Sequence, residues 1–168
     1  PILESKKEKK VTISDDLTGL PTRKEAMELL LKHVKDKYQI MHAEMIAYVM
    51  EKYAEKLKEN LDLWYVTGLL HDLDFYENPE EHPLVELELF KEKKYPAQLI
   101  HAVAAHYFNK TKVMPSTKLA KTLLAVDEFV GLMYAYSLMR PTGFKDMKAS
   151  SFKKKFKDKA FAAKVDRD

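Results

Sequence analysis

Apolar residues recur along this chain with the spacing of an α-helix rather than that of a β-strand. Residues 38–58 show this most clearly, because their large apolar side chains return about once per helical turn. These side chains are Met45, Ile46, Val49, Tyr53 and Leu57. The same spacing predicts further helices over residues 22–35, 62–70, 83–93, 96–107 and 117–139, and a last basic helix or pair of turns over 150–165.

Polar capping residues and helix breakers mark several of these boundaries. Thr22 followed by Glu25 fits the capping box, in which two side chains accept hydrogen bonds from free backbone N–H groups of the first turn. We expect Asp62 to cap the third helix and Ser116 to cap the sixth. Pro141 and the glycine that follows end the sixth helix. Because the connections are short, neighbouring helices should pack directly against one another.

Composition agrees with an all-helical fold in one domain. The chain has 168 residues, of which 46% are hydrophobic and only four are glycine, enough for one real core and little more. We therefore predict an all-α, compact single-domain bundle of about six to seven helices. Residues 1–21 are expected to form a polar tail and a turn, and residues 22–168 the helical domain with its basic C-terminal segment.

Two absences narrow the class of protein. No run of 18 or more apolar residues is present, so we expect no membrane span, and no apolar signal-peptide core follows the first residues. The chain has no cysteine, which excludes a thiolate metal site and disulfides. Any tightly held metal must use His, Asp or Glu. A cytoplasmic location is the expectation.

The positive charge is concentrated at the C-terminal end. From Arg140 onward the chain carries ten Lys or Arg and four Asp or Glu, a local charge of +6, while the remainder carries 19 against 22, a local charge of −3. Such a surplus favours either a nucleic-acid surface or a basic collar around an anionic substrate. A solvated lysine-rich helix explains it equally well.

Three polar residues stand where the helical pattern places apolar ones. Asp127 lies within the apolar stripe of residues 117–139, and His42 and His106 lie on the stripes of their own helices. A carboxylate on such a stripe is costly to bury unless it is paired or bound to a metal. No basic residue shares these stripes. A buried, hydrogen-bonded histidine is the ordinary alternative for each imidazole taken alone.

Together with His71, Asp72 and His82, these three residues form the predicted ligand set of a metal site. His42, His71, Asp72 and Asp127 suit one divalent ion, and His82 and His106 suit a second ion, with Asp72 bridging the two. Nitrogen and carboxylate ligands without sulfur favour Fe, Mn, Ni, Co or Mg. Two alternatives stay open: His82 as a helix cap or solvated loop residue, and His101 in place of His106.

The segment Gly68-Leu69-Leu70-His71-Asp72 resembles the GLLHD signature of the HD-domain superfamily. His42 and Asp127 fit the other two positions of the H…HD…D pattern in that superfamily, and His82-Pro83 and Ala105-His106 resemble its intervening HP and AH segments. The resemblance covers roughly residues 25–165 and is closest to small stand-alone HDIG-type proteins. Leu73-Asp74 replaces the Ile-Gly of the full HDIG motif, and Asp74 is a candidate to orient His71.

The resemblance implies a metal-dependent phosphohydrolase acting on a nucleotide or another small phosphate ester. Asp72 would then be the catalytic residue, accepting a proton from the attacking water. His101 is a candidate to protonate the leaving group. Phosphate would be bound by basic residues of the C-terminal segment. The candidates are Arg140, Lys154, Lys155 and Lys159.

Two other functions remain open at this point. The same six ligands suit a pair of irons, as in the oxygenases of the HD superfamily. A non-catalytic, metal-stabilised binding module is the third possibility. We do not expect nucleic acid to be a partner, because the spacing of Phe152, Phe156 and Phe161 favours packing on the core over base stacking. A homodimer is kept as an expectation, since dimers are common among soluble proteins.

Overall fold

The computed structural model describes residues 12–163, and all regular secondary structure in this range is helical. The helices are α1 (Arg23–His33), α2 (Lys37–Leu57), α3 (Leu61–Leu70), α4 (Leu84–Glu92), α5 (Ala97–His106), α6 (Phe108–Thr111), α7 (Lys118–Leu138) and α8 (Ala149–Phe156). The predicted all-α bundle is confirmed, with one short helix, α6, that the apolar spacing does not predict. The predicted polar tail over residues 1–11 and the last part of the basic segment, 164–168, lie outside the described residues.

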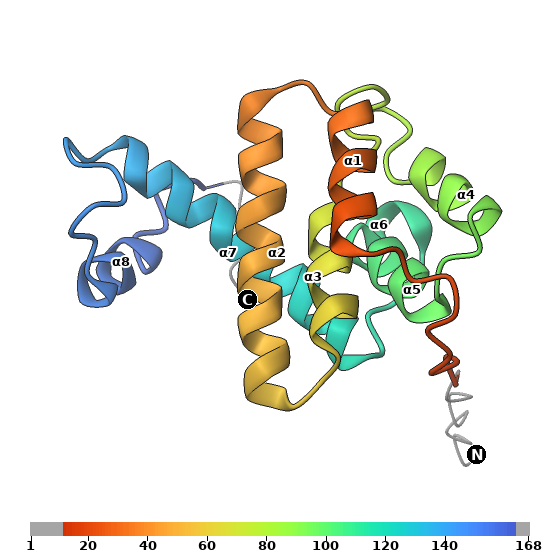
Figure 1. The fold of residues 1–168 in the computed structure, drawn as a ribbon. Helices are drawn as coiled ribbons and strands as arrows, with labels where there is room; N and C mark the ends of the chain where they lie inside the picture. Colours follow the sequence, from red (N-terminus) through yellow and green to blue (C-terminus); the bar gives the residue numbers. More distant parts are fainter. Residues whose placement is uncertain (1–11, 164–168) are drawn as a thin grey trace, which may run out of the picture.

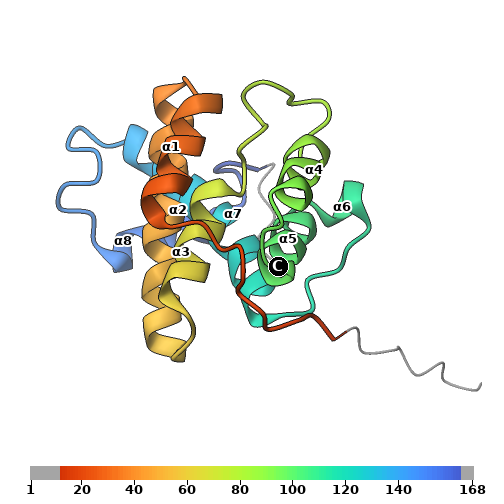
Figure 2. The same cartoon turned by 45° about the vertical axis from the view of Figure 1, so that its right-hand side comes forward.

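Helix α3 forms the centre of the bundle. Seven of its ten residues are buried, including Trp64 and Leu70, as expected for a helix that is apolar all round. Helix α2 packs along α3, α1 packs on α3 as well, and α7 crosses α2. Figures 1 and 2 show α1, α2 and α3 side by side, with α4, α5 and α6 on one flank and α8 on the other. In the described residues, no helix is both long enough and apolar enough to cross a bilayer.

The buried face of α2 differs from the predicted one. Tyr53 and Leu57 are largely exposed, while small residues such as Ala47 and Ala54 are fully buried together with Ile46. The reason is the close approach of α3, which contacts α2 on the side of Ala47 and Met50, away from Tyr53 and Leu57. The sequence analysis therefore placed the buried face of α2 on the side of its large apolar residues, whereas the observed buried face includes the small residues that α3 contacts.

Side-chain caps start α1, α2, α3 and α7, although two of the caps are not the expected ones. Thr22 and Glu25 form the predicted capping box of α1. Asn60, not Asp62, accepts from the backbone N–H of Leu63 and caps α3. Asp62 instead accepts from Arg23 on α1. Thr117, not Ser116, caps α7, and Ser116 hydrogen-bonds His101.

Gly68 permits the close contact between α2 and α3. A Cβ atom at this position would lie 3.0 Å from the Ala47 Cα atom and 3.0 Å from the Met50 Cγ atom. Backbone atoms cannot yield as a flexible side chain can. The glycine of the GLLHD segment is therefore needed for packing, three residues before the first ligand of that segment.

The variant Gly68→Ala should lower the free energy of unfolding by about 1–3 kcal/mol, because overpacking at the α2–α3 contact outweighs the better helix propensity of alanine. Chemical denaturation monitored by circular dichroism measures this. Gly131→Ala on α7 is the matched control, since a Cβ atom there would meet nothing within 4 Å. The control should gain about 0.5–1 kcal/mol, and an equal response of the two variants would contradict the packing argument.

Candidate metal centre

Six side chains predicted from the sequence converge where α2, α3, α5 and α7 meet. They are His42, His71, Asp72, His82, His106 and Asp127. They come from the second turn of α2, the C-terminal end of α3 and the turn after it, the loop before α4, the last residue of α5 and the middle of α7. Two of the alternatives that the sequence left open are decided by this arrangement, because His82 and His106 both face the cluster.

The first half of the cluster joins two histidines to two carboxylates. The Nε2 atom of His42 lies 3.0 Å from Asp127 Oδ1 and 4.0 Å from Asp72 Oδ2. The Nε2 atom of His71 lies 3.4 Å from the same Asp72 oxygen and 3.6 Å from Asp127 Oδ1. Two imidazole nitrogens and two carboxylate oxygens therefore surround one point.

The second half of the cluster uses the other oxygen of Asp72. Asp72 Oδ1 lies 3.3 Å from His82 Nε2 and 3.4 Å from His106 Nε2, and these two nitrogens lie 3.2 Å apart. Asp72 thus faces one pair of histidines with each of its oxygens. This is the arrangement expected of a carboxylate that bridges two cations.

Helix ends hold two of the imidazole rings. The Nδ1–H group of His71 donates to the Gly68 carbonyl at 2.8 Å, and that of His106 donates to the Val103 carbonyl. Both acceptors belong to the last turn of a helix, where carbonyls lack partners within the helix. With the proton held on Nδ1, the lone pair of Nε2 is directed into the cluster.

Asp74 orients His82 rather than His71, which corrects the expectation from the sequence. Asp74 Oδ1 accepts from His82 Nδ1 at 2.6 Å, whereas His71 already donates to a backbone carbonyl. Asp74 is itself held by Glu86, because each residue accepts from the backbone N–H of the other, at 3.1 and 2.9 Å. The loop between α3 and α4 folds back so that His82 and Glu86 lie beside Asp74. Asp74 therefore contacts His82 and not His71.

Glu86 was missed in the sequence, although its position four residues after His82 was a usable signal. It is 1% exposed. Burial, and then the negative charges of Asp74 and Asp72, raise its pKa well above the usual value. A protonated Glu86 adds no further negative charge beside Asp74. Its Oε1 atom is buried without a hydrogen-bond partner in the structure.

The field of the cluster favours positive charge. Burial alone would lower the pKa of His71, but the carboxylates of Asp72 and Asp127 raise it to about 9. Burial would raise the pKa of Asp72, yet His71 and His106 lower it to about 2. The pKa of Asp127 is likewise held below its usual range, because His42 and His71 outweigh burial. A divalent cation supplies the same compensation to the two carboxylates.

The side chains present fit a metal ion. The Nε2 atom of His71 is fully buried and has no hydrogen-bond partner in the described structure. Buried polar atoms normally have a partner, and a metal ion could serve as the partner of this nitrogen lone pair. Three groups have ligand atoms within 4.8 Å of one another. They are His42, His71 and Asp72; Asp72, His82 and His106; and Asp74, His82 and Glu86. The first two share Asp72 and could hold one ion each, whereas the third is explained by its own hydrogen bonds.

The basic residues predicted to bind phosphate are not brought to the cluster. In the described part of the chain, none of them makes a hydrogen bond or ion pair with a cluster residue. Arg140 donates to the Gly143 carbonyl at 2.6 Å. Lys155 pairs with Asp158 at 2.8 Å, while Lys154 and Lys159 are exposed. Their role in binding phosphate stays a prediction.

The packing of α8 explains this placement. Phe152 of α8 is buried against Phe129 and Tyr136 of α7, with ring centroids 5.1 and 6.1 Å apart. Phe129 lies about 200° around the α7 axis from Asp127, since successive residues turn by about 100°. Helix α8 therefore packs on the face of α7 opposite Asp127, and Figures 1 and 2 show it on the flank of the bundle opposite α4 and α5. Of the three phenylalanines expected to pack on the core, Phe152 is buried, whereas Phe156 and Phe161 are half-buried.

His101 lies outside the cluster, although it was a candidate to protonate a leaving group. Its Nε2 atom lies 3.1 Å from Ser116 Oγ. It also lines an apolar cavity of about 530 Å³ between α4, α5 and the segment 12–14. His101 lies outside the cluster because it is on a different face of α5 from His106, which is directed inward.

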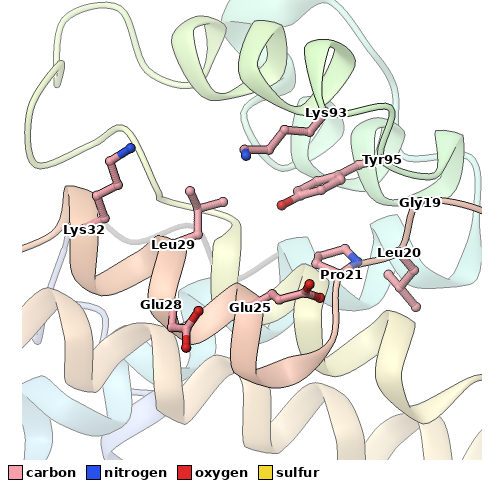
Figure 3. Close-up of a pocket in the computed structure, with 9 residues that line it drawn as sticks. All are labelled: Gly19, Leu20, Pro21, Glu25, Glu28, Leu29, Lys32, Lys93 and Tyr95. Atoms are coloured by element: carbon pink, nitrogen blue, oxygen red, sulfur yellow. The ribbon is translucent and has the colours of Figure 1, made fainter.

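A second cavity, of about 550 Å³, lies between α1 and the turn after α4. Figure 3 shows Glu25 and Leu29 of α1 on one side of it and Lys93 and Tyr95 on the other. None of its lining residues is a histidine. This cavity is therefore separate from the cluster, and it has no part in the argument for a metal site.

The comparisons with known proteins agree with this geometry. The family model described as HD domain matches residues 40–131, a range that contains all six cluster residues. The chain belongs to the HD domain family. That family consists largely of metal-dependent hydrolases. Searches of curated proteins and of solved structures gave no significant match.

The amount of bound metal in variants should show whether each half of the cluster holds its own ion. Asp72→Ala should reduce bound divalent metal in both halves, because both contact Asp72. His82→Ala and His106→Ala should each remove the ion of the second half alone. Inductively coupled plasma mass spectrometry after loading and dialysis measures this, with circular dichroism to verify folding. Unchanged stoichiometry in a folded His82→Ala variant would rule out the second ion.

Asp74→Asn should weaken binding at the second half by about 10- to 100-fold, the usual effect of losing a carboxylate behind a metal-binding histidine. Isothermal titration with Mn²⁺ measures this. The matched control is Glu77→Gln, because Glu77 pairs with His33 in an exposed histidine–carboxylate contact at 3.1 Å. The control should titrate like the parent protein, and equal loss in both variants would contradict the role of Asp74.

Proposed function

We propose that this protein is a metal-dependent phosphohydrolase that acts on a nucleotide or another small phosphate ester. The observation that supports this most is the position of Asp72, whose two oxygens each face a pair of histidines. Membership of the HD domain family supports the same class of reaction. A divalent ion held there would lower the pKa of a bound water and polarise a phosphoryl oxygen.

Asp72 and Asp127 define the side from which a substrate approaches. Their side chains are 28% and 27% exposed, whereas that of His71 is fully buried. The histidines thus form the floor of the site, and the carboxylates form its open edge. A phosphate ester reaches the cluster past these two residues.

Asp72 is positioned to accept a hydrogen bond from the attacking water. Its pKa is lowered to about 2, because the neighbouring histidines outweigh its burial, so it stays ionised at neutral pH and can accept a hydrogen bond from the attacking water. The two histidine pairs hold it from both sides, which restricts its rotation.

A diiron oxygenase is the second candidate. The observation in its favour is the division of the cluster into two histidine pairs that share one carboxylate. Iron analysis with Mössbauer spectroscopy after anaerobic purification separates the candidates. An oxygen-coupled redox change of two irons would favour the oxygenase. The basic-tail binding module has less support, because Phe152 is buried in the α7–α8 contact.

Protein stripped with a chelator should release no phosphate from a panel of nucleotides and sugar phosphates. Reloading with Mn, Fe, Co, Ni or Mg should restore release. Asp127→Asn should lower kcat/KM by about 100-fold or more, since it removes a ligand and an ionised carboxylate. Phosphate release with malachite green measures this. Asp62→Asn, an exposed carboxylate on α3, is the control and should retain activity; absence of turnover with every metal would refute the proposed function.

A further inference from the structure

Two tyrosines stand beside the open edge of the cluster. Tyr38 lies one helical turn before His42 on α2, and Tyr134 lies two turns after Asp127 on α7. Their ring centroids are 4.5 Å apart, and the Tyr38 ring lies 6.0 Å from that of His42. Both tyrosines therefore share a helix face with a cluster residue.

Tyr38 lies on the accessible side of the cluster. It is 40% exposed, and its ring lies 6.0 Å from that of His42, whose Nε2 atom is 3.0 Å from Asp127 Oδ1. The side chain of Asp127 is 27% exposed and belongs to the open edge. Tyr38 therefore borders the approach to the cluster rather than its buried side.

The aromatic surface at this edge is accessible. Tyr38 is 40% exposed, and Phe144, with its ring 6.4 Å from that of Tyr134, is also exposed. Exposed aromatic rings beside a charged site favour a ligand that has a planar apolar part joined to an anionic part. A nucleoside phosphate has both parts, and its ribose separates them by the width of one sugar ring.

We propose that Tyr38 and Tyr134 form a stacking platform for the nucleobase of a nucleoside phosphate whose phosphate group is held at the Asp72 cluster. This rests on the proposed phosphohydrolase function and narrows its substrate class. The two rings already contact each other, so the base stacks on the accessible face of Tyr38 rather than between them. Stacking tolerates any base, because every base has a π-face, and the platform selects for the presence of a base.

The test compares adenosine 5′-monophosphate with ribose 5-phosphate, which has the same phosphate and sugar and no base. The parent protein should have a KM for the nucleotide about tenfold below that for the sugar phosphate, the usual effect of one stacked base. Tyr38→Leu should remove this difference by raising only the KM for the nucleotide, while kcat stays the same. Tyr38→Phe should keep the difference, because it keeps the ring.

Two controls separate stacking from a structural role. Tyr48→Leu changes an exposed tyrosine further along α2, which is 59% exposed, and should leave both KM values unchanged. Melting temperatures of all variants show whether loss of the Tyr38–Tyr134 contact merely loosens the fold. Equal KM values for the two substrates in the parent protein, or an equal change for both in Tyr38→Leu, would overturn the proposal.

Calorimetric titration of the metal-loaded protein with the same two compounds provides a readout apart from turnover. If no phosphate ester is hydrolysed with any metal, the proposed function fails. A preference for the nucleotide that Tyr38→Leu abolishes would then still support the platform. Without that preference in the titration, the platform fails whether or not hydrolysis occurs.

Discussion

The carboxylate of Asp72 is the group on which the arrangement of this protein depends. One oxygen faces His42 and His71, and the other faces His82 and His106. A single side chain thus joins residues from α2, the end of α3, the loop before α4 and the end of α5. Removing it would take away the negative charge that lies between the four inward imidazoles, and an uncompensated charge at a buried site is costly. The close packing of α2 on α3, through Gly68 and Ala47, holds Asp72 at the place where these elements meet.

The C-terminal ends of two helices orient histidines of the cluster. His71 and His106 stand at the C-terminal ends of α3 and α5, where free carbonyls accept their Nδ1–H groups. The same helix ends carry partial negative charge, which adds to the carboxylates in favouring a cation. His82 has no such helix end, and the buried pair Asp74 and Glu86 takes that place. The cluster is therefore closed on the histidine side and open on the side of the carboxylates, where the tyrosines of α2 and α7 stand.

Much of the fold and of the cluster could be predicted from the sequence. The wrong predictions arose where contacts between distant segments, and not local pattern, decide the structure. Ligand types, their order and their helices follow from polar residues on apolar stripes and from the GLLHD segment. The buried face of α2 was misjudged because apolar size was taken as a guide to burial, whereas α3 packs against a face of α2 that includes the small residues Ala47 and Ala54. The partner of Asp74 was misjudged because its neighbour in sequence is not its neighbour in space. The position of α8 could not be read from its charge, because Phe152 packs α8 on the face of α7 opposite Asp127; phosphate binding by its lysines stays a prediction.

The amino-acid sequence by itself determined that residues 22–139 form helices, that the available strong metal ligands are imidazoles and carboxylates, and that His42, His106 and Asp127 face inward from their helices. Local physics is sufficient for this, since helical period, capping and the absence of thiols act over a few residues. Only the tertiary structure decided that the two oxygens of Asp72 serve different histidine pairs, that Glu86 supports Asp74, and that Tyr38 meets Tyr134. The Asp74–Glu86 contact joins residues 12 positions apart and the Tyr38–Tyr134 contact joins residues 96 positions apart. Their geometry depends on how the helices cross, which no local pattern contains.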